Sequence, residues 1–154
     1  MPILSKRLMN AVRREIRSSG DKPPRFLDLA GNCMTGEDTL ADSRRRRSYA
    51  LQESINQGRP YLYAAAPGVM TWVLGLEDRH MILGSLMGAE VMVPDGADAA
   101  ADTLAYLVRH GLTRTDAAAF LAKLKVWPLA RVDAVALKAQ EAFYAQSGWT
   151  CSDE

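Results

Sequence analysis

The sequence predicts an α+β fold in which helices flank an antiparallel β-sheet. Residues 61–93 read as three short strands in succession, because apolar residues there alternate at a period of two and turn-forming residues separate the runs. Helical periodicity fills the segments on both sides of this stretch. The loops between the strands are too short for a parallel crossover, so consecutive strands must run antiparallel. We therefore expect a meander with helices on one face, within a single domain of residues 1–154.

The first predicted helix covers residues 3–18, and its apolar residues fall on one narrow stripe. The stripe consists of Leu4, Leu8, Val12 and Ile16. It fits two roles, which are packing on the helix's own domain or pairing with a second copy to form a homodimer. The following run at residues 18–24, rich in Ser, Gly and Pro, ends the helix.

Residues 26–42 carry glycine and asparagine turn signals and predict a loop-rich segment near the sheet. Residues 26–29 within it fit either a short strand or a turn of helix. Cys33 lies within this segment. We interpret it as a small, buried or half-buried apolar residue, which is the commonest role of a free cysteine.

The second predicted helix covers residues 42–57, with Asp42 or Ser43 as its N-cap. Four consecutive arginines occupy positions 44–47 near its start and suggest phosphate or DNA binding at first sight. Successive helical residues are about 100° apart, so these arginines fan out around the helix and favour a solvated face paired with local acids such as Glu53. The side chains expected to face inward are Tyr49, Leu51, Gln52 and Ile55.

The central strands are separated by recognisable turns. Residues 61–66 form the first strand and end at Pro67-Gly68, which suits a type II turn. Strict alternation over residues 70–76 predicts the second strand, and the polar residues 77–80 predict a hairpin loop. The third strand runs over residues 81–93, where two internal glycines indicate a bulge or the close approach of another backbone.

Three further helices are predicted after the sheet. They run from Asp98 or Asp102 to about Arg109, from Thr113 or Thr115 to about Lys125, and over residues 129–146. The last two are separated by Val126-Trp127-Pro128, because proline cannot continue the helical hydrogen bonds.

Composition excludes several classes of protein. The net charge of +1 argues against a dedicated nucleic-acid-binding protein, which normally has a clear basic excess. No apolar run reaches the length that spans a bilayer, and the N-terminus lacks a signal-peptide pattern. The two cysteines lie far apart and indicate no disulfide framework. We therefore expect a cytoplasmic protein with no membrane partner.

Candidate catalytic groups are sparse, and no cofactor is expected. Only His80 and His110 have a side chain of the type that serves as a near-neutral general base, and neither belongs to a recognisable motif. Cysteine and histidine lack the paired spacing of a zinc site, and the glycine-rich run at residues 84–88 lacks the Lys and Ser/Thr of a phosphate loop. A small enzyme that uses Cys33 with one of these histidines is the weakest of the functional hypotheses.

The sheet does carry residues that suit a ligand pocket. We predict that Tyr61, Tyr63, Trp72, Met87 and Glu90 bind a small organic molecule, since ligand sites are mostly apolar with a few placed polar groups. Neighbouring small residues leave space beside the large ones. The alternative interpretation is that the aromatic residues are core under the helices.

The central stretch resembles the PocR-type sensory domain of bacterial transcription regulators and signalling proteins. The similar segments are Gly58-Arg59-Pro60, Tyr63, Pro67-Gly68-Val69, residues 72–76 and residues 83–91. The resemblance implies a PAS/GAF-like fold that binds small hydrocarbon derivatives such as diols. Glu90 stands where that family usually has glutamine, and a carboxylate accepts hydrogen bonds but does not donate them. A ligand with hydrogen-bond donors or positive charge is therefore favoured.

The leading hypothesis is thus a ligand-sensing regulatory domain that does not bind nucleic acid directly, since no basic recognition helix is present. The competing hypothesis is a structural or dimerisation module with a filled core and no ligand. A cavity beside the sheet distinguishes the two.

Overall fold

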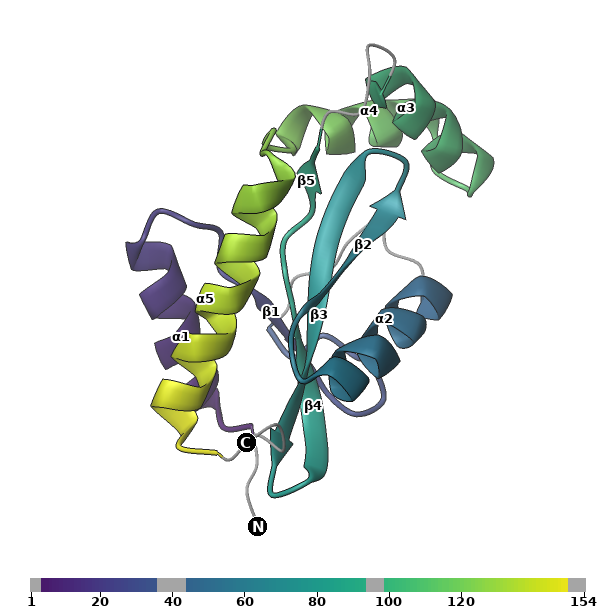
Figure 1. Cartoon of the computed structure of the whole chain (residues 1–154). Helices are drawn as coiled ribbons and strands as arrows, with labels where there is room; N and C mark the ends of the chain where they lie inside the picture. Colours follow the sequence, from purple (N-terminus) through teal and green to yellow (C-terminus); the bar gives the residue numbers. More distant parts are fainter. Residues whose placement is uncertain (1–3, 36–43, 94–98, 150–154) are drawn as a thin grey trace.

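The computed structural model describes residues 4–35, 44–93 and 99–149, and it shows an α+β fold (Figure 1). The described residues form five helices and a five-stranded antiparallel sheet. In chain order the elements are α1 (Lys6–Ser18), β1 (Arg25–Leu27), α2 (Arg44–Gln57), β2 (Tyr61–Ala66), β3 (Val69–Asp78), β4 (Met81–Met87), β5 (Val91–Met92), α3 (Ala99–Arg109), α4 (Arg114–Lys123) and α5 (Leu129–Ser147). The predicted N-cap candidates Asp42, Ser43 and Asp98 lie outside the described residues.

The strands follow the order β1-β4-β3-β2, and β5 pairs with β3. The antiparallel meander of β2, β3 and β4 was predicted and is confirmed. The predicted third strand is in fact divided into β4 and β5, because residues 88–90 leave the ladder between them. Strand β1 corresponds to the short strand that was one of the two alternatives for residues 26–29, and it lies at one edge of the sheet while β2 lies at the other.

Helices cover both faces of the sheet, whereas the sequence led us to expect one covered face (Figure 1). Trp72, Leu74 and Leu76 point to one face and pack in a core cluster with residues of α1 and α5. Val73 points to the opposite face and packs in a second cluster with residues of α2, α3 and α4. Strand β3 is therefore buried on both sides, which requires a helical layer on each. We call these the α5 face and the α2 face.

The apolar stripe of α1 packs on α5 within the same domain. Val12 and Ile16 are fully buried, and Met9 is buried beside them. The helix begins at the N-cap Ser5, whose side chain accepts a hydrogen bond of 3.1 Å from the backbone N–H of Leu8. Of the two predicted roles for the stripe, packing on its own domain is the one that the structure shows.

Helix α2 lies close to β3 because Gly75 has no side chain. A Cβ atom at Gly75 would overlap the side chain of Ile55. The backbone N–H of Gly75 donates a hydrogen bond of 3.1 Å to the hydroxyl of Ser54, which fixes the helix on the sheet. This contact places the opposite, N-terminal end of α2 beside strand β2.

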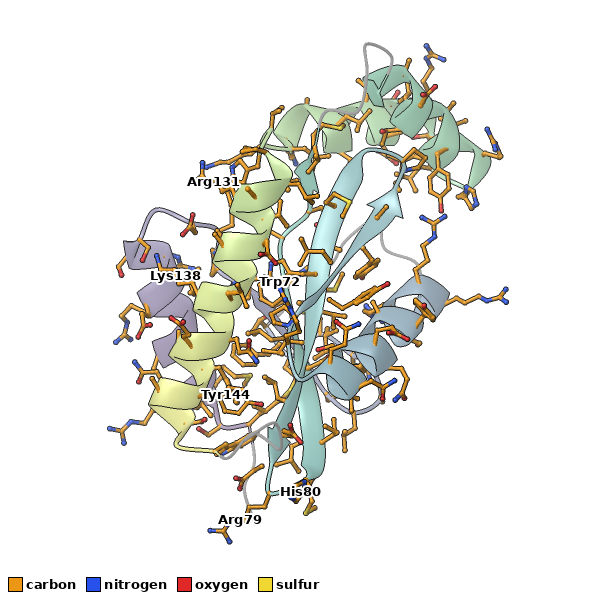
Figure 2. All side chains as sticks on the ribbon, in the orientation of Figure 1. Trp72, Arg79, His80, Arg131, Lys138 and Tyr144 are labelled. Atoms are coloured by element: carbon orange, nitrogen blue, oxygen red, sulfur yellow. The ribbon has the colours of Figure 1, made fainter. Side chains whose placement is uncertain are left out.

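The ends of the remaining strands and helices are set by local turn and capping residues. The two-residue turn at Arg79 and His80 has positive φ at both positions, so β3 and β4 extend further than the predicted loop allowed (Figure 2). Thr113 caps α4 by accepting a hydrogen bond of 3.1 Å from the N–H of Asp116. Gly148, in the left-handed conformation, ends α5.

Among the residues that the structure describes, no helix is both long and apolar enough to cross a bilayer.

Candidate functional site

The five predicted ligand-binding residues are divided between the two faces of the sheet. Tyr61, Tyr63 and Met87 belong to the α2 face. Glu90 also reaches this face, through a contact with Arg25. Trp72 lies on the α5 face, so it cannot line the same pocket as the others (Figure 2).

Trp72 is a core residue. Its side chain is buried, and its indole lies against the backbone at Gly88. The hollow beside it has a volume of only about 10 Å³, close to the lower limit for a single water molecule. Among the described residues, the hollow beside Trp72 therefore has no room for a small organic ligand.

Glu90 forms a buried ion pair with Arg25. The distance between Arg25 Nη2 and Glu90 Oε1 is 2.8 Å, and the two side chains are only 6% and 10% exposed. Arg25 Nη2 also donates to the carbonyl oxygen of Gly88, as does the hydroxyl of Thr71 at 2.8 Å. Arg25 Nε is buried without a hydrogen-bond partner among the described residues. The carboxylate predicted to meet a ligand is thus held by an internal cation.

Arg25 was not singled out in the sequence, although the sequence contained a signal for it. A carboxylate within an apolar strand region is costly to bury unless a cation pairs with it. Glu90 therefore implied a basic partner. Its partner lies 65 residues away in the chain, and sequence spacing gives no means of choosing among the arginines.

Tyr61 and Tyr63 line a groove between α2 and β2, which we call the α2–β2 groove. It has a volume of about 530 Å³. Its lining residues are Arg45, Arg46, Tyr49, Tyr61, Leu62, Tyr63 and Ala64. Aromatic and apolar groups thus dominate the groove, and none of these lining side chains is acidic.

Tyr49 and Tyr61 form the aromatic wall of the groove. Their ring centroids lie 6.1 Å apart in an edge-to-face arrangement. Tyr49 was predicted to face inward but is 61% exposed, because the buried face of α2 is centred on Ala50 and Ser54 instead. The nearby carboxylate of Glu53, followed by Tyr61, raises the pKa of Tyr49 above its ordinary value. Its phenol is therefore a neutral hydrogen-bond donor throughout the physiological pH range.

The arginines at the start of α2 point in different directions, as the helical geometry predicts. Arg47 donates to the carbonyl oxygen of Gly31 at 3.2 Å, on the side away from the groove. Arg46 donates to the carbonyl oxygen of Ala64 at 2.9 Å. Arg45 has no ion-pair or hydrogen-bond partner among the described residues. Among the described residues, Arg46 and Arg47 thus contact backbone carbonyl groups, and the expected pairing with local acids stays a prediction.

Arg46 also connects the groove to α3. Its guanidinium carbon lies 5.4 Å from the ring centroid of Tyr106. Tyr106 in turn stacks on His110, with centroids 4.1 Å apart, and His110 Nδ1 lies 2.8 Å from the carbonyl oxygen of Tyr106. Two helices that are separated in the chain thus meet at one arginine side chain.

In the part of the chain that the structure describes, Cys33 forms no pair with either histidine. Cys33 Sγ contacts Thr35 Oγ1 at 3.4 Å, while His110 is engaged with Tyr106. His80 lies at the tip of the β3–β4 hairpin (Figure 2). No described cluster of three or more His, Cys, Asp or Glu side chains has a geometry suited to a metal ion.

Comparison with known proteins gives no match: no family model, no curated protein and no solved structure is similar to this chain. The α+β class rests on the structure itself. The PocR-type resemblance and the PAS/GAF-like description of the fold stay predictions.

Proposed function

We propose that this chain is a small-molecule-sensing regulatory domain of a bacterial transcription regulator or signalling protein, with its ligand in the α2–β2 groove. The observation that carries the proposal is the groove itself. Its volume of about 530 Å³ lies within the ordinary range for small-molecule sites. Tyr61 and Tyr63, two of the residues predicted to bind a ligand, contribute to its wall.

The lining suits a small organic molecule with an apolar body and one polar end. Tyr49 and Tyr61 offer ring surfaces to the body of such a molecule. The guanidinium of Arg45 supplies hydrogen-bond donors at the rim, beside the hydroxyls of Tyr49 and Tyr61, which are hydrogen-bonded to each other. Since Glu90 is held by Arg25, the expectation of a ligand with hydrogen-bond donors or positive charge gives way to one of ligands with acceptor groups, such as diols, polyols and organic acids.

A route from ligand to output runs through Arg46. This side chain contacts both the groove and Tyr106 of α3. A ligand that binds one position of the Arg46 side chain more tightly than another favours the α3 arrangement that goes with that position. The difference in affinity sets the size of the population shift. In this proposal α3 and α4 transmit the signal to an output partner.

A thermal-shift screen tests the proposal. The purified protein is screened against diols, polyols, amines and organic acids, since a ligand that binds only the native state raises the melting temperature by mass action. Tyr61→Ala and Arg45→Ala are expected to abolish the shift while both proteins stay folded. Arg14→Ala, which removes an exposed arginine of α1, is the matched control and keeps the shift. A shift that survives Tyr61→Ala would place the ligand elsewhere, and no shift at millimolar concentration would favour the structural module.

A homodimer and a cytoplasmic location also stay predictions. Because the α1 stripe is occupied by α5, a dimer would have to use another surface. Sedimentation equilibrium measures whether the homodimer forms. A monomer at every concentration would remove the dimerisation hypothesis without affecting ligand binding.

A further inference from the structure

Strand β2 is an edge strand whose outward backbone groups face the α2–β2 groove. The carbonyl oxygen of Trp72 accepts a hydrogen bond of 2.9 Å from Gly88, on the β4 side of β3. In an antiparallel ladder the N–H and C=O of one residue point to the same side. Leu62 lies opposite Trp72 in the register, so its N–H and C=O point away from β3. Ala64, two residues further along, has the same orientation, and its carbonyl meets Arg46 outside the sheet.

The groove follows this backbone edge. Four consecutive residues of β2 line it, from Tyr61 to Ala64. Side chains on a strand alternate between the two faces, so consecutive residues border the same groove only along the strand's edge. The groove is thus bounded by the edge of β2 on one side and by the first turns of α2 on the other.

In the part of the chain that the structure describes, the edge lacks the devices that normally prevent strand addition. Natural edge strands are protected by charged residues, by proline or by a covering element. The sequence of β2, YLYAAA, contains neither a charged residue nor proline. Among the described residues, the one side-chain contact made to its outward backbone groups is the hydrogen bond from Arg46 to Ala64.

The charge beside the edge selects the kind of partner. Arg45 and Arg46 flank the groove, and no acidic side chain of the described residues lines it. A second copy that paired through its own β2 would bring the arginines of both copies together, which is repulsive. A strand with acidic side chains has the complementary charge.

We infer that the edge of β2 binds an extended acidic segment of a partner protein by strand addition. The N–H and C=O groups of Leu62 and the N–H of Ala64 pair with the peptide backbone. Acidic side chains of the peptide pair with Arg45 and, once it leaves the carbonyl of Ala64, with Arg46. This inference goes beyond small-molecule sensing and does not depend on it, because it uses the backbone edge and the arginines. A molecule seated in the groove would compete with the peptide.

Fluorescence anisotropy with labelled peptides tests the inference. The probe is an acetylated and amidated peptide of alternating valine and glutamate, about eight residues long, the length of an ordinary strand. Replacing its glutamates by lysines is expected to weaken binding about tenfold or more through charge repulsion. Methylating alternate backbone nitrogens removes the edge hydrogen bonds and is expected to weaken binding about tenfold.

Variants of the protein identify the surface. Ala64→Pro removes an N–H that points into the groove without touching the β2–β3 ladder, and it is expected to reduce peptide affinity while the protein stays folded. Arg45→Ala is expected to reduce affinity, whereas Arg14→Ala is not. Amide hydrogen exchange gives an independent measurement. The peptide should slow exchange at Leu62 and Ala64 and leave Tyr61 and Tyr63, already paired in the ladder, unchanged.

Three results would overturn the inference. One is an unchanged affinity for the lysine or N-methylated peptide. Another is the absence of binding by the acidic peptide. The third is slow amide exchange at Leu62 and Ala64 in the absence of peptide, with exchange becoming slower as the protein concentration rises. That result would identify a second copy of the chain as the occupant of this edge.

Discussion

The indole of Trp72 lies so close to the backbone of Gly88 that a Cβ atom at position 88 would overlap Nε1. The contact fastens the start of the β4–β5 connection to the α5-face core. The predicted third strand is interrupted directly at this contact, over residues 88–90.

Gly88→Ala is therefore expected to lower the free energy of unfolding by about 1–3 kcal/mol, the usual cost of overpacking. Urea denaturation measures it. In a Trp72→Phe background the added methyl group meets a smaller ring, so its cost should fall. Equal costs in the two backgrounds would show that the contact between these residues is not responsible.

Glu90→Gln is expected to lower the free energy of unfolding by about 3 kcal/mol, because it leaves the buried guanidinium of Arg25 without its counter-charge. The combined variant Arg25→Met with Glu90→Leu removes both charges and should recover much of that loss. Urea denaturation of the single and combined variants gives the coupling between the two residues. Additive losses would mean that the ion pair does not couple them.

The pKa of Tyr49 is expected to fall toward its ordinary value in Glu53→Gln. The carboxylate of Glu53 is the largest cause of the raised value, since a negative charge nearby opposes formation of the phenolate. A titration followed by NMR of ring-labelled tyrosine resolves this residue. Glu141→Gln, an exposed substitution on α5, should leave the Tyr49 titration unchanged. A similar fall in both variants would indicate a general charge effect.

Arg46→Ala is expected to loosen the docking of α3. The substitution removes the contact with the Tyr106 ring and the hydrogen bond to Ala64. Amide exchange in α3, for example at Leu107, should become about three- to fivefold faster, the effect of losing one exposed cation–π contact. Arg45 makes no such contact among the described residues, so Arg45→Ala is the matched control. Equal exchange in the two variants would exclude Arg46 as the link.

The sequence predicted the secondary structure better than the arrangement of the layers. The turns and alternation of residues 61–87 correctly gave the order and direction of β2, β3 and β4. Alternation shows which residues share a face, but it does not show what covers that face. Trp72 and Val73 are both buried, on opposite faces of the sheet, and only the tertiary structure shows which helices cover each of them.

The candidate groove was predicted in part. Tyr61 and Tyr63 were identified from their strand, whereas Tyr49 was assigned to the buried side of its helix. Helix α2 buries small residues such as Ala50 and Ser54, so its apolar pattern is too weak to set the helical phase. The contact of Arg46 with β2 depends on how closely α2 approaches the sheet. Gly75 of β3, far from Arg46 in the sequence, sets that distance.

The packing of α1 on α5 has a consequence for biosynthesis. These helices lie far apart in the chain, so α1 is synthesised well before its packing partner. Val12 and Ile16 therefore reach their buried environment only once α5 has left the ribosome. The α5-face core closes after translation of α5, and until then the nascent chain carries an open apolar helix.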